Sequence, residues 1–143
     1  MDTQLKNKLK QHALTIRKDV VTQTFNAKSG HPGGSLSIAE VMAYLYFKEM
    51  NVDPQNPDWQ DRDRFVLSKG HTCPALYSCL AQKGFFDASE LKNFRQLSSM
   101  LQGHPDMNKI PGVDMSTGSL GQGVSAAAGL ALAGKVDKKN YRV

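Results

Sequence analysis

The stretch "STGSLGQGVSAAAGLALAGK", Ser116–Lys135, joins a glycine-rich turn to a run of small and aliphatic residues. The glycines at 118, 121 and 123 leave the main chain uncovered, so a ligand can approach its N–H and C=O groups closely. Their spacing, G-x-x-G-x-G, differs from the dinucleotide fingerprint G-x-G-x-x-G, and the turn has no P-loop lysine. We therefore interpret the turn as a main-chain ligand site of another kind, at the start of a helix.

The small residues after this turn predict a helix from about Leu120 to Ala133 that ends at Gly134. Its alanines and glycines would let a second main chain pack very closely against it. We therefore expect this helix to be buried in a tightly packed core, and to lie against a neighbour.

The first half of the chain predicts two helices. Apolar residues spaced three and four apart indicate a long amphipathic helix over residues 5–27, which the segment "KSGHPGGS" at 28–35 ends. Ser37 and Glu40 have the spacing of a capping box, which predicts a second helix through about Met50.

Two short apolar segments predict strands, "RFVLS" at 64–68 and the start of another in "YRV" at 141–143. Between them we expect a helix over 74–83, a short helix capped by Asp87 and a loop over 98–123. Helices joined to buried strands indicate an α/β fold, with a site formed by loops at the strand ends. Because the second strand is not completed, we expect the chain to be part of a larger fold.

Length and composition suit one soluble domain. The chain has 143 residues, of which 40% are hydrophobic and 22% charged, and no apolar run approaches the roughly 20 residues of a membrane span. The formal charge is +5, but no aromatic residues interleave with the basic ones, so we expect no nucleic-acid site. The two cysteines, Cys73 and Cys79, predict no disulfide framework, and no secretory signal is present, which favours the cytoplasm.

Three histidines each follow a glycine in a predicted loop: His31, His71 and His104. Imidazole can bind hydroxyls and phosphates and can transfer protons near neutral pH. Three histidines could also hold a catalytic zinc, although no two of them are closely spaced. A metallohydrolase is therefore an alternative, whereas His12 on the first helix is interpreted as a surface or packing residue.

Four motifs, "KSGHPGGSLS", "LSKGHTCPALYSCLAQKGFF", "GHPD" and "STGSLGQGVSAAAGLALAGK", resemble the N-terminal part of transketolases in order and spacing, over about residues 10–143. Transketolases use thiamine diphosphate to move a two-carbon ketol unit between sugar phosphates, a reaction of the pentose phosphate pathway. The resemblance implies an α/β domain, helix-rich with a parallel sheet, which holds the diphosphate through Mg²⁺ or Ca²⁺. Ser119, where many single-chain transketolases have proline, is typical of the N-terminal subunit of two-chain transketolases.

The resemblance also implies roles for individual residues. His31 matches a histidine near the substrate hydroxyls, His71 one near the diphosphate and the reacting centre, and His104 one that contacts the ketol oxygens of the donor. These three are the expected catalytic residues. The cofactor-binding residues are expected to be His71 and a loop whose main chain contacts the aminopyrimidine ring: Gly118, Ser119 and Leu120.

The metal-binding signature of the family, Gly-Asp-Gly followed by Asn, is expected just beyond Val143, so no metal ligand is expected within residues 1–143. Residues 1–143 would then form a partial thiamine-diphosphate-binding domain that is inactive alone. It would act with a C-terminal transketolase part or subunit, in a homo-oligomer or heterotetramer. A non-catalytic α/β module whose alanine-rich helix binds a partner chain is the other alternative.

Overall fold

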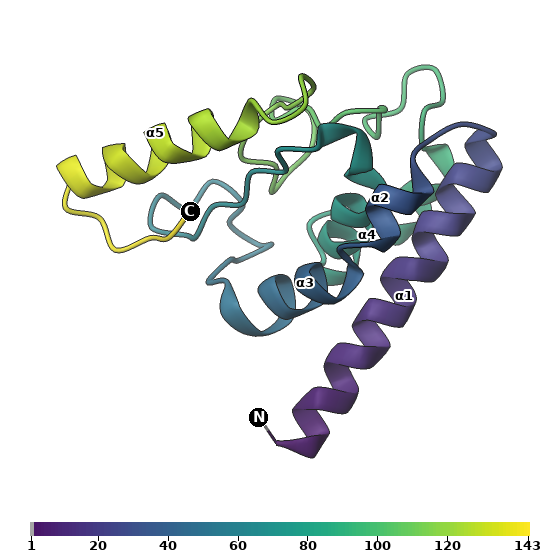
Figure 1. Ribbon diagram of the computed structural model, residues 1–143, viewed down its shortest axis with the longest axis horizontal. Helices are drawn as coiled ribbons and strands as arrows, with labels where there is room; N and C mark the ends of the chain where they lie inside the picture. Colours follow the sequence, from purple (N-terminus) through teal and green to yellow (C-terminus); the bar gives the residue numbers. More distant parts are fainter. Residues whose placement is uncertain (1) are drawn as a thin grey trace.

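The computed structural model describes residues 2–143, and its helices form one cluster from which the last helix stands apart (Figure 1). The elements, in chain order, are α1 (Thr3–Ala27), α2 (Pro32–Leu36), α3 (Ala39–Tyr44), the π-helix η1 (Leu45–Glu49), the 3₁₀-helix η2 (Gly70–Thr72), α4 (Cys73–Lys83), the 3₁₀-helix η3 (Ala88–Asn93) and α5 (Gly123–Val136).

Helix α1 confirms the long amphipathic helix. The Asp2 side chain caps it by accepting hydrogen bonds from the N–H groups of Gln4 and Leu5, at 2.6 and 3.2 Å. Lys28 ends it in the left-handed conformation, with φ +48°. The buried face of α1 packs against α3 and α4 and consists of Leu9, Ala13, Ile16, Val20 and Gln23.

The predicted helix through about Met50 is confirmed as α3 followed directly by the π-helix η1, which ends at Glu49. Pro32 opens a separate short helix, α2, and the predicted capping box is wrong. The Ser37 hydroxyl donates backwards to the Gly34 carbonyl (2.9 Å), so it does not cap α3. Glu40 instead forms an ion pair with Arg17 of α1 (2.7 Å).

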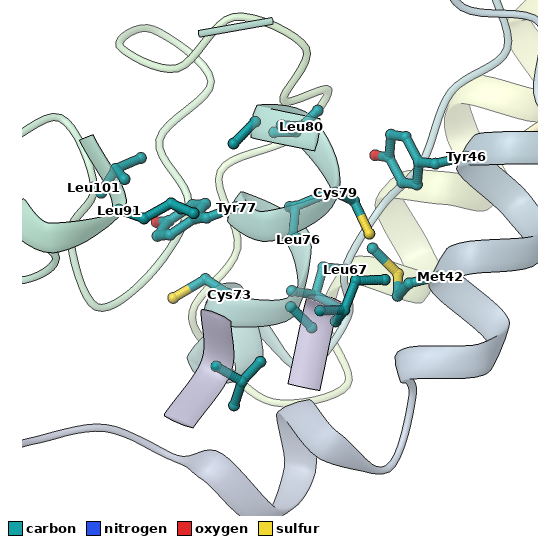
Figure 2. Close-up of a cluster of buried hydrophobic side chains, with 14 of the residues drawn as sticks. Met42, Tyr46, Leu67, Cys73, Leu76, Tyr77, Cys79, Leu80, Leu91 and Leu101 are labelled. Atoms are coloured by element: carbon teal, nitrogen blue, oxygen red, sulfur yellow. The ribbon is translucent and has the colours of Figure 1, made fainter. Parts of the chain in front are cut away.

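Helix α4 forms the centre of the core. Its residues from Cys73 to Ala81 are all buried, and they pack among the side chains of Met42, Tyr46, Leu91 and Leu101 (Figure 2). Gly84 ends α4 with φ +97°, directly after the helix predicted over residues 74–83. Asp87 caps the next turn by accepting from the Ser89 N–H (2.7 Å), although this turn is a 3₁₀-helix.

Both cysteines are free and buried in this core. Burial raises the pKa of the Cys73 thiol to about 12. The thiol therefore stays protonated near neutral pH, and Cys73 is not a candidate nucleophile.

No strand is present in residues 2–143, so neither the two predicted strands nor a parallel sheet is found there. The two segments nevertheless lie side by side. The Arg64 N–H donates to the Arg142 carbonyl (2.9 Å), and the Arg142 N–H donates to the Asp63 carboxylate (2.7 Å). One main-chain bond does not form a ladder, because a ladder needs repeated pairing with a partner strand.

Helix α5 differs from its prediction at both ends and in its burial. It begins at Gly123 and continues past Gly134, which packs against the Tyr141 ring. Only Gly123 and Gly134 are buried, while Val124 and Leu132 are 65% and 63% exposed. Within residues 2–143, the expectation that α5 is buried is therefore wrong. Among residues 2–143, no helix has the length and hydrophobicity that a membrane span requires.

Candidate active site

The three glycine–histidine loops meet on one side of the helix cluster. His31 precedes α2, His71 lies in η2 just before α4, and His104 lies in the loop that follows η3. The rings of His31 and His71 are edge to face, with their centroids 4.8 Å apart. Both His31 and His104 are close enough for their charges to affect the titration of His71.

The pKa of His71 lies below its ordinary value of 6.5. Partial removal of its ring from water is the largest cause, and repulsion by His31, His104 and Lys69 adds to it. His71 is therefore a neutral imidazole near pH 7, which can accept a proton at one ring nitrogen and donate from the other.

Close packing between α2 and η2 holds His31 beside His71. The Ser35 hydroxyl is within donor distance of the His31 carbonyl (2.9 Å) and the Thr72 carbonyl (3.3 Å), so it links the two loops. A Cβ atom on Gly34 would lie 2.6 Å from the Thr72 side chain. Only glycine permits this approach without a shift of the two loops.

Lys69 adds a second link between the same loops. Its ammonium group donates to the Gly34 carbonyl (2.8 Å) and to the Ser37 hydroxyl (3.1 Å). Sequence reasoning gave Lys69 no role, although its place directly before Gly70 and His71 is a usable signal.

The loop that opens α5 packs directly against η2. A Cβ atom on Gly70 would lie 2.5 Å from the Thr117 carbonyl oxygen. The Thr117 hydroxyl is buried and has no hydrogen-bond partner among the described residues. Gly121, in the left-handed region with φ +87°, donates its N–H to the Ser68 carbonyl (2.9 Å). These contacts fix the loop beside the histidines.

The segment 118–120 presents uncovered main chain beside an apolar hollow. Gly118, Ser119 and Leu120 are exposed, and their N–H groups make no hydrogen bond to residues 2–143. A hollow of about 400 Å³ lies between Leu120 and α3, lined mainly by Ile38, Val41, Phe65 and Leu67. Free donors beside an apolar surface suit a flat heteroaromatic ring.

His12 lies outside this cluster, as predicted. Its ring stacks on Phe47, with the centroids 3.6 Å apart, and a ring nitrogen is hydrogen-bonded to Gln82 (3.0 Å). His12 is therefore a packing residue.

The three-histidine zinc site is not formed. Within residues 2–143, no group of three His, Cys, Asp or Glu side chains is arranged to hold a metal ion. The metallohydrolase alternative therefore has no structural support.

Comparison with known proteins identifies close relatives. The family described as "Transketolase, thiamine diphosphate binding domain" matches residues 8–142. The 6-deoxy-6-sulfo-D-fructose transketolase subunit SqwG of Clostridium sp. (strain MSTE9) is 52% identical over 129 residues, which are 90% of this chain and 47% of that protein. One of the subunits of the apulose-4-phosphate transketolase of Phocaeicola vulgatus is 44% identical over 126 residues, 88% of this chain and 44% of that protein.

Solved structures agree with the sequence comparison. The transketolase of Campylobacter jejuni superposes with a TM-score of 0.87 at 41% identity, over 96% of this chain and 21% of that chain. The present chain thus spans less than half the length of each of these relatives.

Proposed function

The chain belongs to the transketolase family, as its thiamine diphosphate binding domain, and on this premise we propose that it supplies part of a transketolase active site. The reaction would transfer a two-carbon ketol unit between sugar phosphates. The observation that carries this proposal is the placement of His31 and His71, with His104 nearby, beside the uncovered loop 118–120.

The residues present fit the ring portion of thiamine diphosphate. The free N–H groups of Gly118, Ser119 and Leu120 can bind the aminopyrimidine, and the apolar hollow beside Leu120 can receive part of the cofactor. When bound, the cofactor supplies a carbanion nucleophile and an electron sink for breaking and forming the carbon–carbon bond.

The histidines of this chain would handle the sugar hydroxyls and their protons. His31 and His104 would bind hydroxyl and ketol oxygens through their imidazole nitrogens. His71, held neutral by its surroundings, would exchange a proton at an imidazole nitrogen near the reacting centre. Such proton transfer contributes roughly 10²–10⁴-fold to a reaction rate.

The diphosphate and its metal need residues from elsewhere. The resemblance to transketolases places the metal-binding signature beyond Val143, so the ligands of a Mg²⁺ or Ca²⁺ ion are expected outside residues 1–143. The exposed apolar side chains of α5 would contact the remaining part of the enzyme, and two relatives are themselves named as transketolase subunits. The assembly would be a homo-oligomer or heterotetramer, and the free cysteines favour a reducing cytoplasm.

A chimera tests the proposed function. This chain would replace the matching N-terminal residues of the Campylobacter jejuni transketolase, and ketol transfer from a phosphorylated ketose would be measured with thiamine diphosphate and Mg²⁺. We expect activity in the chimera, none from the 143-residue chain alone, and a loss of about 100-fold or more in the His31→Ala, His71→Ala and His104→Ala chimeras. His12→Ala is the matched control and should retain activity.

Full activity in a chimera in which His31, His71 and His104 are all replaced by alanine would contradict the proposal. The exposed face of α5 also fits a non-catalytic module that only binds a partner chain. Such a module would associate with its partner without affinity for thiamine diphosphate, which calorimetric titration with the cofactor and Mg²⁺ would reveal.

A further inference from the structure

Arg95 lies between two of the three histidine loops. Its Nη1 donates to the Ser29 hydroxyl, in the loop that carries His31. Its guanidinium packs on Gly103, directly before His104, so closely that a Cβ atom there would lie 2.9 Å from Nε and from Nη2. One side chain therefore contacts both loops.

The neighbouring residue strengthens the same connection. Phe94 is fully buried, and its ring would lie 3.4 Å from a Cβ atom on Gly30, directly before His31. The guanidinium carbon of Arg95 lies 5.4 Å from the centroid of the Phe94 ring. The pair Phe94–Arg95 thus contacts the glycine that precedes each of two site histidines, Gly30 and Gly103.

The main chain at Arg95 is held in a rare conformation. Its φ is +60°, a region that non-glycine residues enter at a cost, and its N–H donates to the Leu101 carbonyl (2.8 Å). This turn places the arginine side chain between the two loops and ties residue 95 to the start of the His104 loop.

Stability alone does not explain an arginine here. Its Nε is buried and has no hydrogen-bond partner within residues 2–143, which is unfavourable for folding. An apolar side chain would avoid this cost, but it would lose the hydrogen bond to Ser29. It would also lose the planar guanidinium group, which covers Gly103.

We propose that Arg95 is a positioning residue, which fixes the His31 and His104 loops relative to each other. This inference rests on the proposed function of the two histidines, and Arg95 itself needs no contact with substrate or cofactor.

The test uses NMR on the 143-residue chain without cofactor, with the four histidine ring signals assigned by His→Gln variants. In Arg95→Ala, the ring signals of His31 and His104 should shift or broaden, while those of His12 stay in place. The rate of amide hydrogen exchange in the loops around Ser29 and Gly103, which Arg95 contacts, should rise about tenfold. The loss of one hydrogen bond to a charged group implies a change of this size. Arg95→Lys should protect the Ser29 loop better than the Gly103 loop, because an ammonium group lacks the planar fork.

Arg17→Ala is the matched control, because Arg17 is another partly buried arginine, paired with Glu40 and outside the histidine loops. A purely structural role would lower the melting temperature in both variants without singling out His31 and His104. Gly103→Ala and Ser29→Ala retain Arg95 and provide folded variants if Arg95→Ala does not fold. Each should disturb the loop whose contact it alters.

Unchanged ring signals and exchange in these variants, or an equal disturbance of His12, would overturn the proposal. Cofactor binding is titrated separately, so the two proposals can fail independently. Loosened loops in Arg95→Ala, together with a Campylobacter jejuni chimera that neither binds thiamine diphosphate nor transfers a ketol unit, would refute the proposed function and keep the role of Arg95. Cofactor binding with unchanged loops would refute the role of Arg95 alone.

Discussion

His31 and His71 lie edge to face with their ring centroids 4.8 Å apart, although they belong to separate loops. The Ser35 hydroxyl and the close approach of Gly34 to Thr72 hold these loops together. At this separation, a positive charge on one ring disfavours a positive charge on the other. His31 therefore contributes to the lowered pKa of His71, which can be measured directly.

Replacing His31 or His104 by glutamine should raise the pKa of His71 toward its ordinary value of 6.5. Burial lowers this pKa most, and the two histidines lower it further, so each single change removes part of the shift. A pH titration of the His71 ring signals by NMR measures the effect. The matched control, His12→Gln, should leave the pKa of His71 unchanged, and an unchanged value in both other variants would exclude the coupling.

The same shift makes stability depend on pH. Because the pKa of His71 is lower in the folded chain than in the unfolded one, the unfolded state binds more protons in the window between the two values. The contribution of His71 is present above about pH 6.5 and is lost as the pH falls through the folded pKa. His71→Gln should remove this part of the pH dependence in urea unfolding, whereas an unaltered slope would contradict the assignment.

Gly70→Ala should destabilise the chain by about 2 kcal/mol, because its Cβ would lie 2.5 Å from the Thr117 carbonyl and something must shift. Gly33→Ala is the control, since a Cβ at Gly33 in α2 meets nothing within 4 Å. That change should be neutral or stabilising by up to about 1 kcal/mol. Urea unfolding measures both, and a second Thr117→Ala change should not rescue Gly70→Ala, because the carbonyl remains.

Local sequence signals predicted the elements that depend on their own residues. The long helix α1, predicted from its apolar spacing, and helix α4, predicted over residues 74–83, belong to this class. The segment at 64–68 failed as a strand because pairing needs a partner, and Arg142 supplies a single main-chain bond. The prediction that Gly134 ends the helix was wrong, because this glycine instead allows the Tyr141 ring to pack closely against α5.

The candidate site was predictable only in part. The glycine before each histidine identified the three candidate histidines. Their proximity in space, however, depends on contacts between loops, such as Lys69 with Gly34 and Phe94 with Gly30. Arg95 was missed because nothing in "NFRQL" distinguishes a residue that links loops from an exposed arginine. The expected burial of α5 failed because the small residues of a helix do not reveal which chain covers them.

Asp63→Asn should destabilise the chain by about 2 kcal/mol, the scale of a hydrogen bond to a charged group. The buried carboxylate accepts from the Asn51 N–H (2.9 Å) and from the N–H and guanidinium of Arg142 (2.7 and 2.8 Å). Burial raises the pKa of Asp63, but the hydrogen bonds from Arg142 and Asn51 outweigh it and lower the pKa below 3.8.

The pH dependence of this contribution follows from the lowered pKa. The stabilisation is present above about pH 3.8 and is lost as the pH falls through the folded pKa, so Asp63→Asn should flatten acid unfolding in that range. Asp61→Asn is the control, because Asp61 pairs with Lys139 at an exposed site and should cost less than about 1 kcal/mol. An equal loss of unfolding free energy in the two variants would show that the buried contacts of Asp63 stabilise the chain no more than an exposed ion pair does.

Gly129→Ala should have opposite effects on the stability of the isolated chain and of the assembled enzyme. A Cβ at Gly129 meets nothing within 4 Å in the middle of α5, so alanine should stabilise the isolated chain by up to about 1 kcal/mol. If the exposed side of α5 packs against the rest of a transketolase, the added methyl group should clash there and lower the melting temperature of the Campylobacter jejuni chimera. Gly134→Ala, whose Cβ would lie 2.8 Å from the Tyr141 ring, should destabilise both proteins. Stabilisation of both proteins by Gly129→Ala would mean that this side of α5 stays uncovered in the assembly, and the proposed partner contact would be wrong.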